Sequence, residues 1–597
     1  MKADKADSVD TRFRFNVDTN EWTHHIRITN VNTLTVKRQE IIAHYKGNPQ
    51  VSILIVGAGV NGIGTFRDLA LQGVDVLMVD KGDFCSGASA ASSHMVHGGI
   101  RYLENGEFRL VREAVQERNR LIENAPHYVK PLPTVIPIFK WLSGLFNAPL
   151  KFMRWLDRPS ERGAVVIKIG LLFYDAFTRK QGTVPKHQFK SRSASQEEFP
   201  KINSKVRFTA RYYDGAMHTP ERICVEMVLD GETANPDAHA LNYVAIEGAD
   251  GKTVTLKDQL SGQAYVVQPK RVINAGGPWI DKVNAEIGVQ TNFIGGTKGS
   301  HLILENPELR QAIGENEFFY ENKDGRIVLI YPLLDKVMVG TSDLPIDDPE
   351  GVHCTDEEID YFMEMVPIVF PEINVKREQI VFQFSGVRPL PVAEINHPGQ
   401  ISRDHSIKET LPGNGIDFPI YSLVGGKWTS FRAFSEEVTD QAIEALKLSR
   451  KTSTRNLAIG GGRNYPGNQA AYEAWIDTTA HQTNLTYQRI SDLFERYGTR
   501  AKVVAEYISQ GTDAPLQFLP TYSRREIEFI VITEKVIHMD DFLLRRSMLA
   551  KLGRLSWANI NEVANIISNS LNWSVDRRDE EIKRTCQVLK ENHGVVL

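Results

Sequence analysis

Three glycines near residue 60 have the spacing of a dinucleotide-binding turn. Gly57, Gly59 and Gly62 form a G-x-G-x-x-G pattern directly after the apolar run 51–56. The first glycine permits a tight turn, the second lets a pyrophosphate approach the backbone, and the third lets the next helix pack closely. The amide groups at the start of that helix face the phosphates. The pattern predicts a site for the phosphates of a dinucleotide.

A carboxylate completes this pattern. Ile63, Phe66 and Ala70 recur at helical intervals, and a second apolar segment, 74–79, ends in Asp80. An acid about 20 residues beyond the glycines is placed to accept the ribose hydroxyls. Strand, glycines, helix, strand and acid in this order predict a βαβ dinucleotide unit, whereas the glycines alone would also fit an ordinary turn.

The size and charge of the chain exclude several classes of protein. Its 597 residues are too many to share one hydrophobic core, so two or three domains are expected. A net charge of −4 gives no global field that would recruit nucleic acid. The sequence contains no run of 18 apolar residues, so no membrane-spanning helix is predicted. The first 50 residues lack the apolar core of a secretory signal. The scattered cysteines predict neither a zinc site nor disulfides, which fits a reducing cytoplasmic setting: Cys85, Cys224, Cys354 and Cys586.

Further motifs give the sequence a specific resemblance. GAGVNG (57–62) and SSHMVHGGIRYLENGEFRLVREAVQER (92–118) resemble the FAD-dependent glycerol-3-phosphate dehydrogenases and oxidases. The similarity covers roughly residues 51–560 and its motifs stand in the family's order. The others are KIGLLFYDAF (168–177), VINAGGPW (272–279), TKGSHLIL (297–304), VGTSD (339–343), FSGVRPL (384–390), ISRD (401–404), GGKWTSFR (425–432) and LLRRSMLAKLG (543–553).

The resemblance and the strand pattern together give the expected architecture. An α/β protein is expected, with a Rossmann-like FAD-binding domain of the glutathione-reductase/D-amino-acid-oxidase type, an inserted mixed or antiparallel substrate-binding sheet, and an all-helical C-terminal domain. The expected division is an N-terminal extension at 1–50, the interleaved FAD and substrate domains at 51–445, and the helical domain at 446–597. The substrate part is placed mainly at about 205–270 and 295–385.

The resemblance implies oxidation of sn-glycerol 3-phosphate to dihydroxyacetone phosphate, with electrons passing from FAD to a quinone or to oxygen. An alcohol gives up hydride only as its hydroxyl proton leaves, so a base is required. Cations stabilise the developing alkoxide, and arginine suits a phosphate. Four candidate catalytic residues follow, with His97 as base or proton relay, Arg101 and Arg388 as substrate clamps, and Lys427 as a stabiliser of flavin or alkoxide.

Other motif positions are candidate ligands of the substrate or of FAD. Tyr102 and Arg403 join Arg101 and Arg388 as expected substrate-binding residues. The expected FAD-binding residues are Gly57, Gly59, Gly62, Asp80, Ser92, Ser93, Gly276, Gly426, Lys427 and Thr429.

Two departures from the family pattern leave the substrate open. His94 stands where the family's SSKL-like motif usually carries a lysine, and a near-neutral imidazole there changes the local charge. The paired aspartates that precede an Ala-Arg step in the family appear here as HTPERI (218–223). Another polyol phosphate, such as erythritol phosphate, or another electron acceptor is therefore an alternative. An amine or amino-acid oxidase of related fold and a non-enzymatic nucleotide-binding protein are the remaining alternatives.

The segment 138–158 is a candidate membrane contact. It is rich in aromatic residues and leucine, with basic residues among them, and Pro149 interrupts it. Such a segment suits an anionic membrane surface, although an internal helical pair fits equally well. The dehydrogenases of the family are peripheral membrane proteins, so a cytoplasmic protein at the inner face of the membrane is expected. The C-terminal helices could supply a dimer interface.

Overall fold

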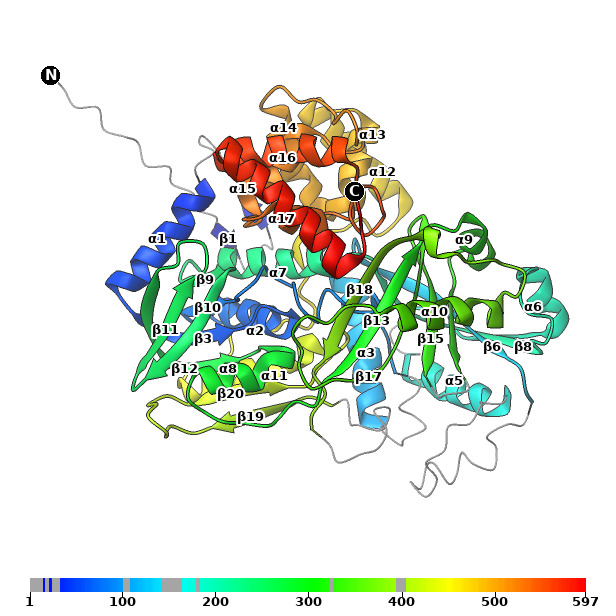
Figure 1. Ribbon diagram of the computed structural model, residues 1–597, viewed down its shortest axis with the longest axis horizontal. Coiled ribbons are helices and arrows are strands. Elements are labelled where there is room, and N and C mark those ends of the chain that lie inside the picture. Colours follow the sequence, from blue (N-terminus) through cyan, green and yellow to red (C-terminus); the bar gives the residue numbers. More distant parts are fainter. Residues whose placement is uncertain are drawn as a thin grey trace.

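The computed structural model describes residues 14–16, 21–23, 33–99, 108–141, 164–178, 183–322, 326–392 and 404–597. Two large sheets lie side by side, and a set of helices from the C-terminal part of the chain lies across them (Figure 1). A hairpin of β1 (Arg14–Asn16) and β2 (Glu21–Thr23) and the helix α1 (Thr33–Gly47) precede the first sheet. The predicted fold class is confirmed.

The first sheet contains the predicted βαβ unit. Strand β3 pairs in parallel with β4 on one side and with β12 on the other. Ile53 and Ile55 of β3 face one core while Leu54 and Val56 face another, which explains why the strand reads as an unbroken apolar run. The strands of this sheet are β3 (Gln50–Val56), β4 (Val76–Val79), β9 (Ala238–Leu241), β10 (Val244–Asp250), β11 (Thr253–Asp258), β12 (Ala264–Asn274), β19 (Ser406–Thr410) and β20 (Ile420–Val424).

Helices cover both faces of this sheet. Three pack together on the face of Ile53, namely α2 (Val60–Leu71), α7 (Pro220–Ala234) and α11 (Phe431–Ala445). Helix α1 covers the other face through Ile41 and Tyr45, together with α8 (Ile280–Glu286) and the short turn η2 (Gly277–Trp279) nearby.

The second sheet is mainly antiparallel. Its central strand β13 pairs with β16, β17 and β18, and β6 pairs with β8 along its whole length. Its strands are β5 (Met95–Val96), β6 (Val129–Ile138), β7 (Gln188–Ser191), β8 (Phe208–Met217), β13 (Thr297–Leu304), β14 (Glu317–Glu321), β15 (Ile327–Leu333), β16 (Lys336–Gly340), β17 (Leu344–Pro345) and β18 (Ile380–Arg388).

Strand β13 alternates its contacts between two layers. Leu302 and Leu304 face the core of α9 (Pro307–Ile313) and α10 (Asp356–Val369), whereas Ile303 faces the C-terminal helices. The remaining helices of this half are α3 (Phe108–Asn124), α5 (Ala164–Thr178), α6 (Arg192–Glu198) and the turn η3 (Arg377–Gln379).

Strand pairing divides the 205–270 segment differently from the sequence-based assignment. Strand β8 belongs to the second sheet, but β9–β12 belong to the nucleotide sheet. Strands β5–β7, from outside the assigned ranges, join the second sheet. Strand pairing therefore places β9–β12 in the nucleotide sheet, while the domain division stays a prediction.

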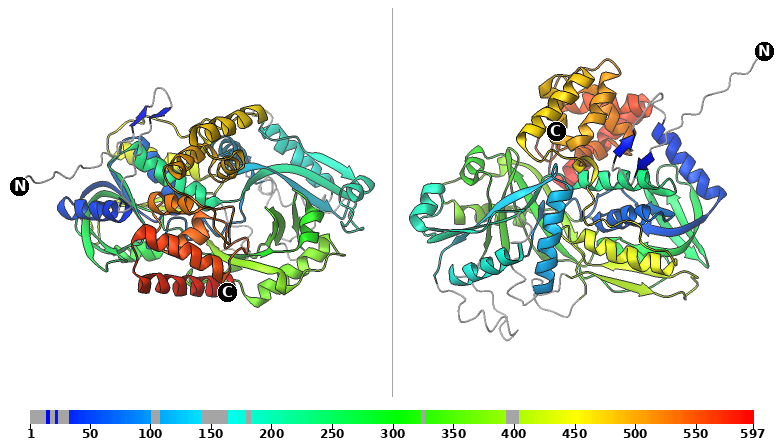
Figure 2. Two further views of the ribbon diagram at one scale, coloured as in Figure 1. Left: turned by 90° about the horizontal axis from the view of Figure 1, so that it is seen from above. Right: turned by 180° about the vertical axis from the view of Figure 1, so that it is seen from behind.

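The C-terminal helices lie over both sheets, as Figure 2 shows from above and behind. They are η5 (Gly460–Gly462), α12 (Gln469–Thr483), α13 (Tyr487–Tyr497), η6 (Gly498–Arg500), α14 (Ala501–Ser509), α15 (Arg524–Thr533), the π-helical turn η7 (Asp541–Arg546), α16 (Trp557–Leu571) and α17 (Val575–His593). In the described part of the chain, no helix is long and apolar enough to cross a membrane.

A buried cluster of charges joins the C-terminal helices to the nucleotide half. The Asp83 carboxylate accepts hydrogen bonds from Arg545 Nε at 2.5 Å and Arg546 Nη2 at 2.9 Å, and all three residues are buried. Burial opposes ionisation of Asp83, but the two guanidinium groups hold its pKa well below the usual range. The cluster fixes the chain where the segment 82–99 leaves β4.

Candidate active site

The predicted glycines form a close three-way contact between β3, α2 and β12. Gly57 has a φ of +107°, and a Cβ there would lie 2.6 Å from the carbonyl oxygen of Ala275. A Cβ at Gly62 would lie 2.0 Å from the oxygen of Gly57. Helix α2 begins at Val60 with Gly59 as N-cap and no side-chain cap. The N-cap residue therefore adds no side chain at this helix end, which fits a pyrophosphate there.

Asp80 holds the glycine turn from the end of β4. Its carboxylate accepts the amide of Ala58 at 2.6 Å and the amide of Gly82 at 2.8 Å. Burial raises the pKa of Asp80 to about 6, although the two hydrogen bonds act in the opposite direction and lower it. The carboxyl thus lies beside the turn, as expected of an acid that binds the adenosine ribose.

Two other turns meet the start of α2. Gly426 has a φ of +95°, and a Cβ there would lie 2.6 Å from Asn61 Nδ2. A Cβ at Gly57 would lie 2.9 Å from the amide nitrogen of Gly276. Ser89 Oγ accepts the amide of Val60 at 2.9 Å. Predicted FAD-binding positions from three distant stretches of sequence therefore gather at one helix end, together with Ser89.

The turn after β20 also fixes the segment that contains His97. Thr429 Oγ1 accepts the His97 amide at 3.1 Å and donates to the His97 carbonyl at 3.2 Å. Lys427 lies two residues before Thr429, on the same turn. The backbones of the predicted base and the predicted stabilising cation are therefore tied together.

Gly98 is held by a fully buried network. Its amide donates to Asp214 Oδ1 at 2.9 Å, and Arg118 Nη1 donates to the same oxygen at 3.2 Å. The hydroxyl of Tyr174 donates to Asp214 and accepts from Arg118. A Cβ at Gly98 would lie 2.2 Å from the Tyr174 hydroxyl, so the contact requires glycine. Two motifs of the resemblance, 92–118 and 168–177, thus meet at this network.

Arg388 lies at the end of β18 with its guanidinium oriented by the loop after β16. It donates to Thr341 Oγ1 at 2.9 Å, to the Ser342 carbonyl at 3.1 Å and to Asp343 Oδ1 at 3.1 Å. Its side chain keeps 25% of its surface exposed. A Cβ at Gly386, on the same strand, would lie 2.5 Å from Ala91 Cβ. Strand β18 therefore touches the 82–99 segment of the nucleotide half.

Ser93 lies at the same junction. Its Oγ is 2.9 Å from His301 Nε2, and the His301 ring stacks on Phe384. Burial, together with the charge of Arg388, lowers the pKa of His301 to about 3, so this imidazole is neutral at physiological pH. Ser92 is next to it and accepts the amide of His94.

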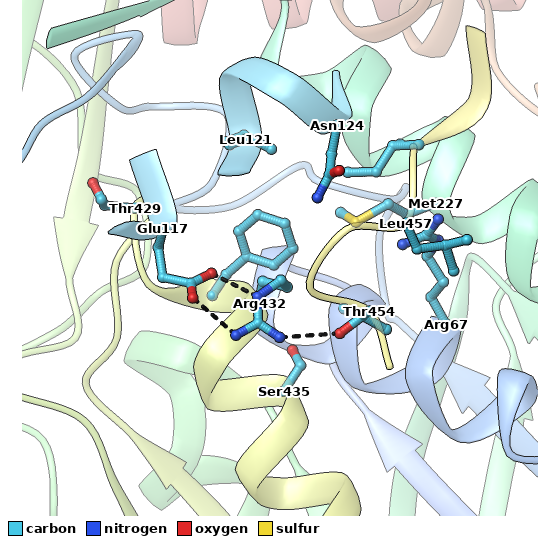
Figure 3. A pocket seen from close by; sticks show the side chains of 13 residues that line it. Arg67, Glu117, Leu121, Asn124, Met227, Thr429, Arg432, Ser435, Thr454 and Leu457 are labelled. Carbon is cyan, nitrogen blue, oxygen red and sulfur yellow. Dashed lines mark hydrogen bonds and ion pairs between the residues drawn. The ribbon is translucent and has the colours of Figure 1, made fainter. Parts of the chain in front are cut away.

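Behind Thr429 an ion pair joins the two helices that follow these motifs. Arg432 on α11 donates to both carboxylate oxygens of Glu117 on α3, at 2.6 and 2.8 Å, and to Thr454 (Figure 3). The cavity beside them measures about 20 Å³, enough for about one water molecule. It is a packing feature next to the site and is too small for a cofactor.

Some predicted and some unpredicted residues complete this account of the site. The predicted residues Arg101, Tyr102 and Arg403 lie outside the described residues. Ser89, Asn61 and Asp214 were missed as residues that hold the site. The dense run of small residues at 82–99 signals a close approach, but it does not show which serine meets α2.

This fold and this cradle define a FAD-dependent oxidoreductase. The family described as FAD dependent oxidoreductase matches residues 52–415, and the C-terminal domain of alpha-glycerophosphate oxidase matches residues 452–578. The chain belongs to the FAD-dependent glycerol-3-phosphate dehydrogenase and oxidase family. FAD is the cofactor, as the sequence predicted.

Relatives match almost the whole chain. A glycerol-3-phosphate dehydrogenase of Synechocystis sp. is 30% identical over 91% of this chain and 97% of that protein. One from Pseudomonas aeruginosa is 28% identical over 83% of this chain and 91% of that protein. The solved glycerol-3-phosphate dehydrogenase from Bacillus halodurans, complexed with FAD, has a TM-score of 0.71 at 19% identity, covering 94% of this chain and 98% of that one, which shows the shared fold.

Gly62→Ala should abolish FAD binding. The new methyl group would overlap the Gly57 carbonyl, which is backbone and cannot move aside without opening the phosphate turn. The purified variant should be colourless and gain no visible absorption on incubation with FAD. Gly170→Ala on α5, where a Cβ meets nothing within 4 Å, is the control and should stay yellow. A yellow Gly62→Ala protein would show that the phosphates bind elsewhere.

Proposed function

We propose that this protein oxidises sn-glycerol 3-phosphate to dihydroxyacetone phosphate and passes the electrons to a membrane quinone. The observation that supports it most is the placement of Arg388. Its guanidinium is partly exposed and is held by hydrogen bonds, and it lies on β18, the strand that contacts the segment 82–99 at Ala91. Arginine's planar fork suits a phosphate beside the cofactor. The two relatives described above are named as glycerol-3-phosphate dehydrogenases, and their names give the same substrate.

The proposed roles follow from the positions of the residues. Bound FAD supplies the hydride acceptor. Arg388, with Arg101, binds the substrate phosphate and orients the carbon that is oxidised. His97 removes the hydroxyl proton, and Lys427, on the turn bonded to His97, stabilises the developing alkoxide. Tyr102 and Arg403 are proposed as further substrate contacts.

The departures at His94 and 218–223 do not place an unpaired charge beside Arg388. His94 is buried against Lys551 and Phe384, and Glu221 and Arg222 have partners on the C-terminal side. Glycerol 3-phosphate therefore remains the first substrate to test. A longer polyol phosphate is the second, and an amino acid, the substrate of the alternative amine or amino-acid oxidase, is the third.

Anaerobic mixing with each substrate distinguishes these functions. Glycerol 3-phosphate should bleach the visible absorption of the bound flavin by the time the solutions have been mixed by hand, whereas glycine should leave the absorption unchanged. If only erythritol 4-phosphate bleached the flavin, it would take the place of glycerol 3-phosphate as the proposed substrate. Bleaching by glycine alone would contradict the proposal of a phosphate substrate.

Arg388→Lys should lower kcat/KM roughly 10–150-fold, the equivalent of about 1.5–3 kcal/mol for a charged hydrogen bond. Arg377→Lys, on the exposed turn η3, should not change it.

We also propose that the protein docks on an anionic membrane through α5 and the adjoining groove. Ile169, Leu172 and Phe173 form an apolar face on α5 in which each side chain is 50–54% exposed, and Trp141 is exposed to the same degree. The α5 amide of Ala164 bonds to the carbonyl of Lys140, so Trp141 lies beside the start of the same helix.

Charge complementarity selects the occupant of this surface. A groove of about 1000 Å³ adjoins Trp141 and Ile167, and its lining includes one acid, Glu321, and the four basic residues Lys140, Arg192, Lys205 and Arg207. Each basic residue near an anionic surface contributes about 1 kcal/mol. The surface lies away from the C-terminal helices (Figure 1), and membrane docking would give access to a quinone rather than only to oxygen. Most of the predicted segment, 142–158, lies outside the described residues.

The vesicle-binding test uses the exposed residues of this face. The wild-type protein should float with phosphatidylglycerol vesicles at low salt, bind less at high salt, and ignore phosphatidylcholine vesicles. Leu172→Glu with Phe173→Glu should remove flotation without changing activity toward a soluble quinone analogue. Leu411→Glu, another exposed apolar position, is the control. Unchanged flotation of the double variant would overturn the assignment of this face.

A further inference from the structure

The two sequence departures meet at one side chain. Lys551, from the segment after η7, lies with its Nζ 3.3 Å from His94 Nε2 and forms an ion pair with Glu221 on α7. All three residues are buried. His94 and Glu221 therefore form one interaction with the C-terminal part of the chain, although they are 127 positions apart in the sequence.

The contact fixes the protonation of His94. A lysine ammonium can only donate, so Nε2 of His94 accepts and the ring proton is assigned to Nδ1. Burial and the neighbouring charge of Lys551 lower the pKa of His94 well below its usual value, and His301 and His218 add to this effect. The imidazole is thus a neutral acceptor, while Glu221 neutralises the lysine.

The active-site segment bends at His94. Its φ is +52°, a conformation that residues other than glycine adopt rarely. Its carbonyl accepts the amide of Met217, and the chain then enters β5 on the way to His97. Ser93, on one side, is held by His301 of β13, and His97, on the other, is held by Thr429.

We propose that Lys551 is a positioning residue for the active site, holding the turn at His94 so that the C-terminal helices set the place of His97. The second sheet holds Ser93, the turn after β20 holds His97, and Lys551 holds the residue between them. This inference rests on the proposed function only for the kinetic readout, because the position of the turn can also be measured without substrate.

Helix α7 provides a matched control. Glu232, at the other end of α7, forms a similar ion pair with Lys535 at 2.8 Å, again between the nucleotide half and the C-terminal part of the chain. Lys535 also bonds to the Ala240 carbonyl and not to the 92–97 segment in the described contacts. Lys535→Met should therefore remove a comparable ion pair without moving the active-site turn.

The central experiment compares Lys551→Met with Lys535→Met in the full-length, FAD-loaded protein. Lys551→Met should lower kcat about 10²-fold, as expected for a shift of about 1 Å in a catalytic group, and should change KM little. It should also change the visible circular dichroism of bound FAD, which is measured without substrate. Lys535→Met should lower the melting temperature but leave kcat and the dichroism unchanged.

Moving the cation provides the rescue. His94→Lys combined with Lys551→Met places an ammonium on the turn itself, within reach of Glu221, and should restore most of the kcat. Should Lys551→Met fail to fold, Lys551→Met with Glu221→Gln removes both charges and takes the same readouts. A Lys551 variant with wild-type kcat and dichroism would overturn the proposal, as would a folded relocation variant without recovery. If no enzyme form acts on glycerol 3-phosphate but the dichroism changes as expected, only the proposed substrate fails.

Discussion

The buried pairing of Asp83 with Arg545 and Arg546 is the interaction on which the arrangement of the site depends. Asp83 stands where the chain leaves β4, immediately before the segment that contains Ser89, Ser92, Ser93 and His97. Removing one partner of a buried ion pair typically costs about 3–5 kcal/mol, because the remaining charge has no solvent. That cost compares with the whole stability of a typical domain, about 5–15 kcal/mol. Separating the C-terminal helices from the nucleotide half would therefore cost a large part of the folding free energy.

The segment 82–99 connects the two halves of the chemistry. Its first part lies against α2 and the glycine turn, through Ser89, and its middle lies against β18, through Ala91. Its last part is tied to the turn after β20 through His97 and to β8 through Gly98. A cofactor on the nucleotide sheet and a phosphate at Arg388 on the second sheet would both border this one segment. This explains why a small-residue stretch whose only strand in the described structure is the two-residue β5 is the central feature of the site.

Local features of the fold could be predicted from the sequence, because glycine spacing and apolar periodicity report local conformation. Gly57, Gly62 and Asp80 were identified in this way, and the structure gives each a steric or hydrogen-bonding reason. Sheet membership is not local: β10 and β11 pair with each other and β11 pairs with β12, and no local pattern in these segments shows which sheet they extend. The contact of Asp83 with Arg546 spans 463 residues, and no spacing rule reaches that far. His94 and Glu221 were recognised as unusual, but their common partner, Lys551, was visible only in the folded chain.

A crystal structure of the FAD-loaded protein with dihydroxyacetone phosphate would test the central claim most directly. We expect the FAD pyrophosphate over the first turn of α2, the product phosphate in contact with the guanidinium of Arg388, and His97 beside the product carbonyl. A phosphate bound away from Arg388, with His97 remote from the carbonyl, would contradict the account even if the glycine turn held FAD as described.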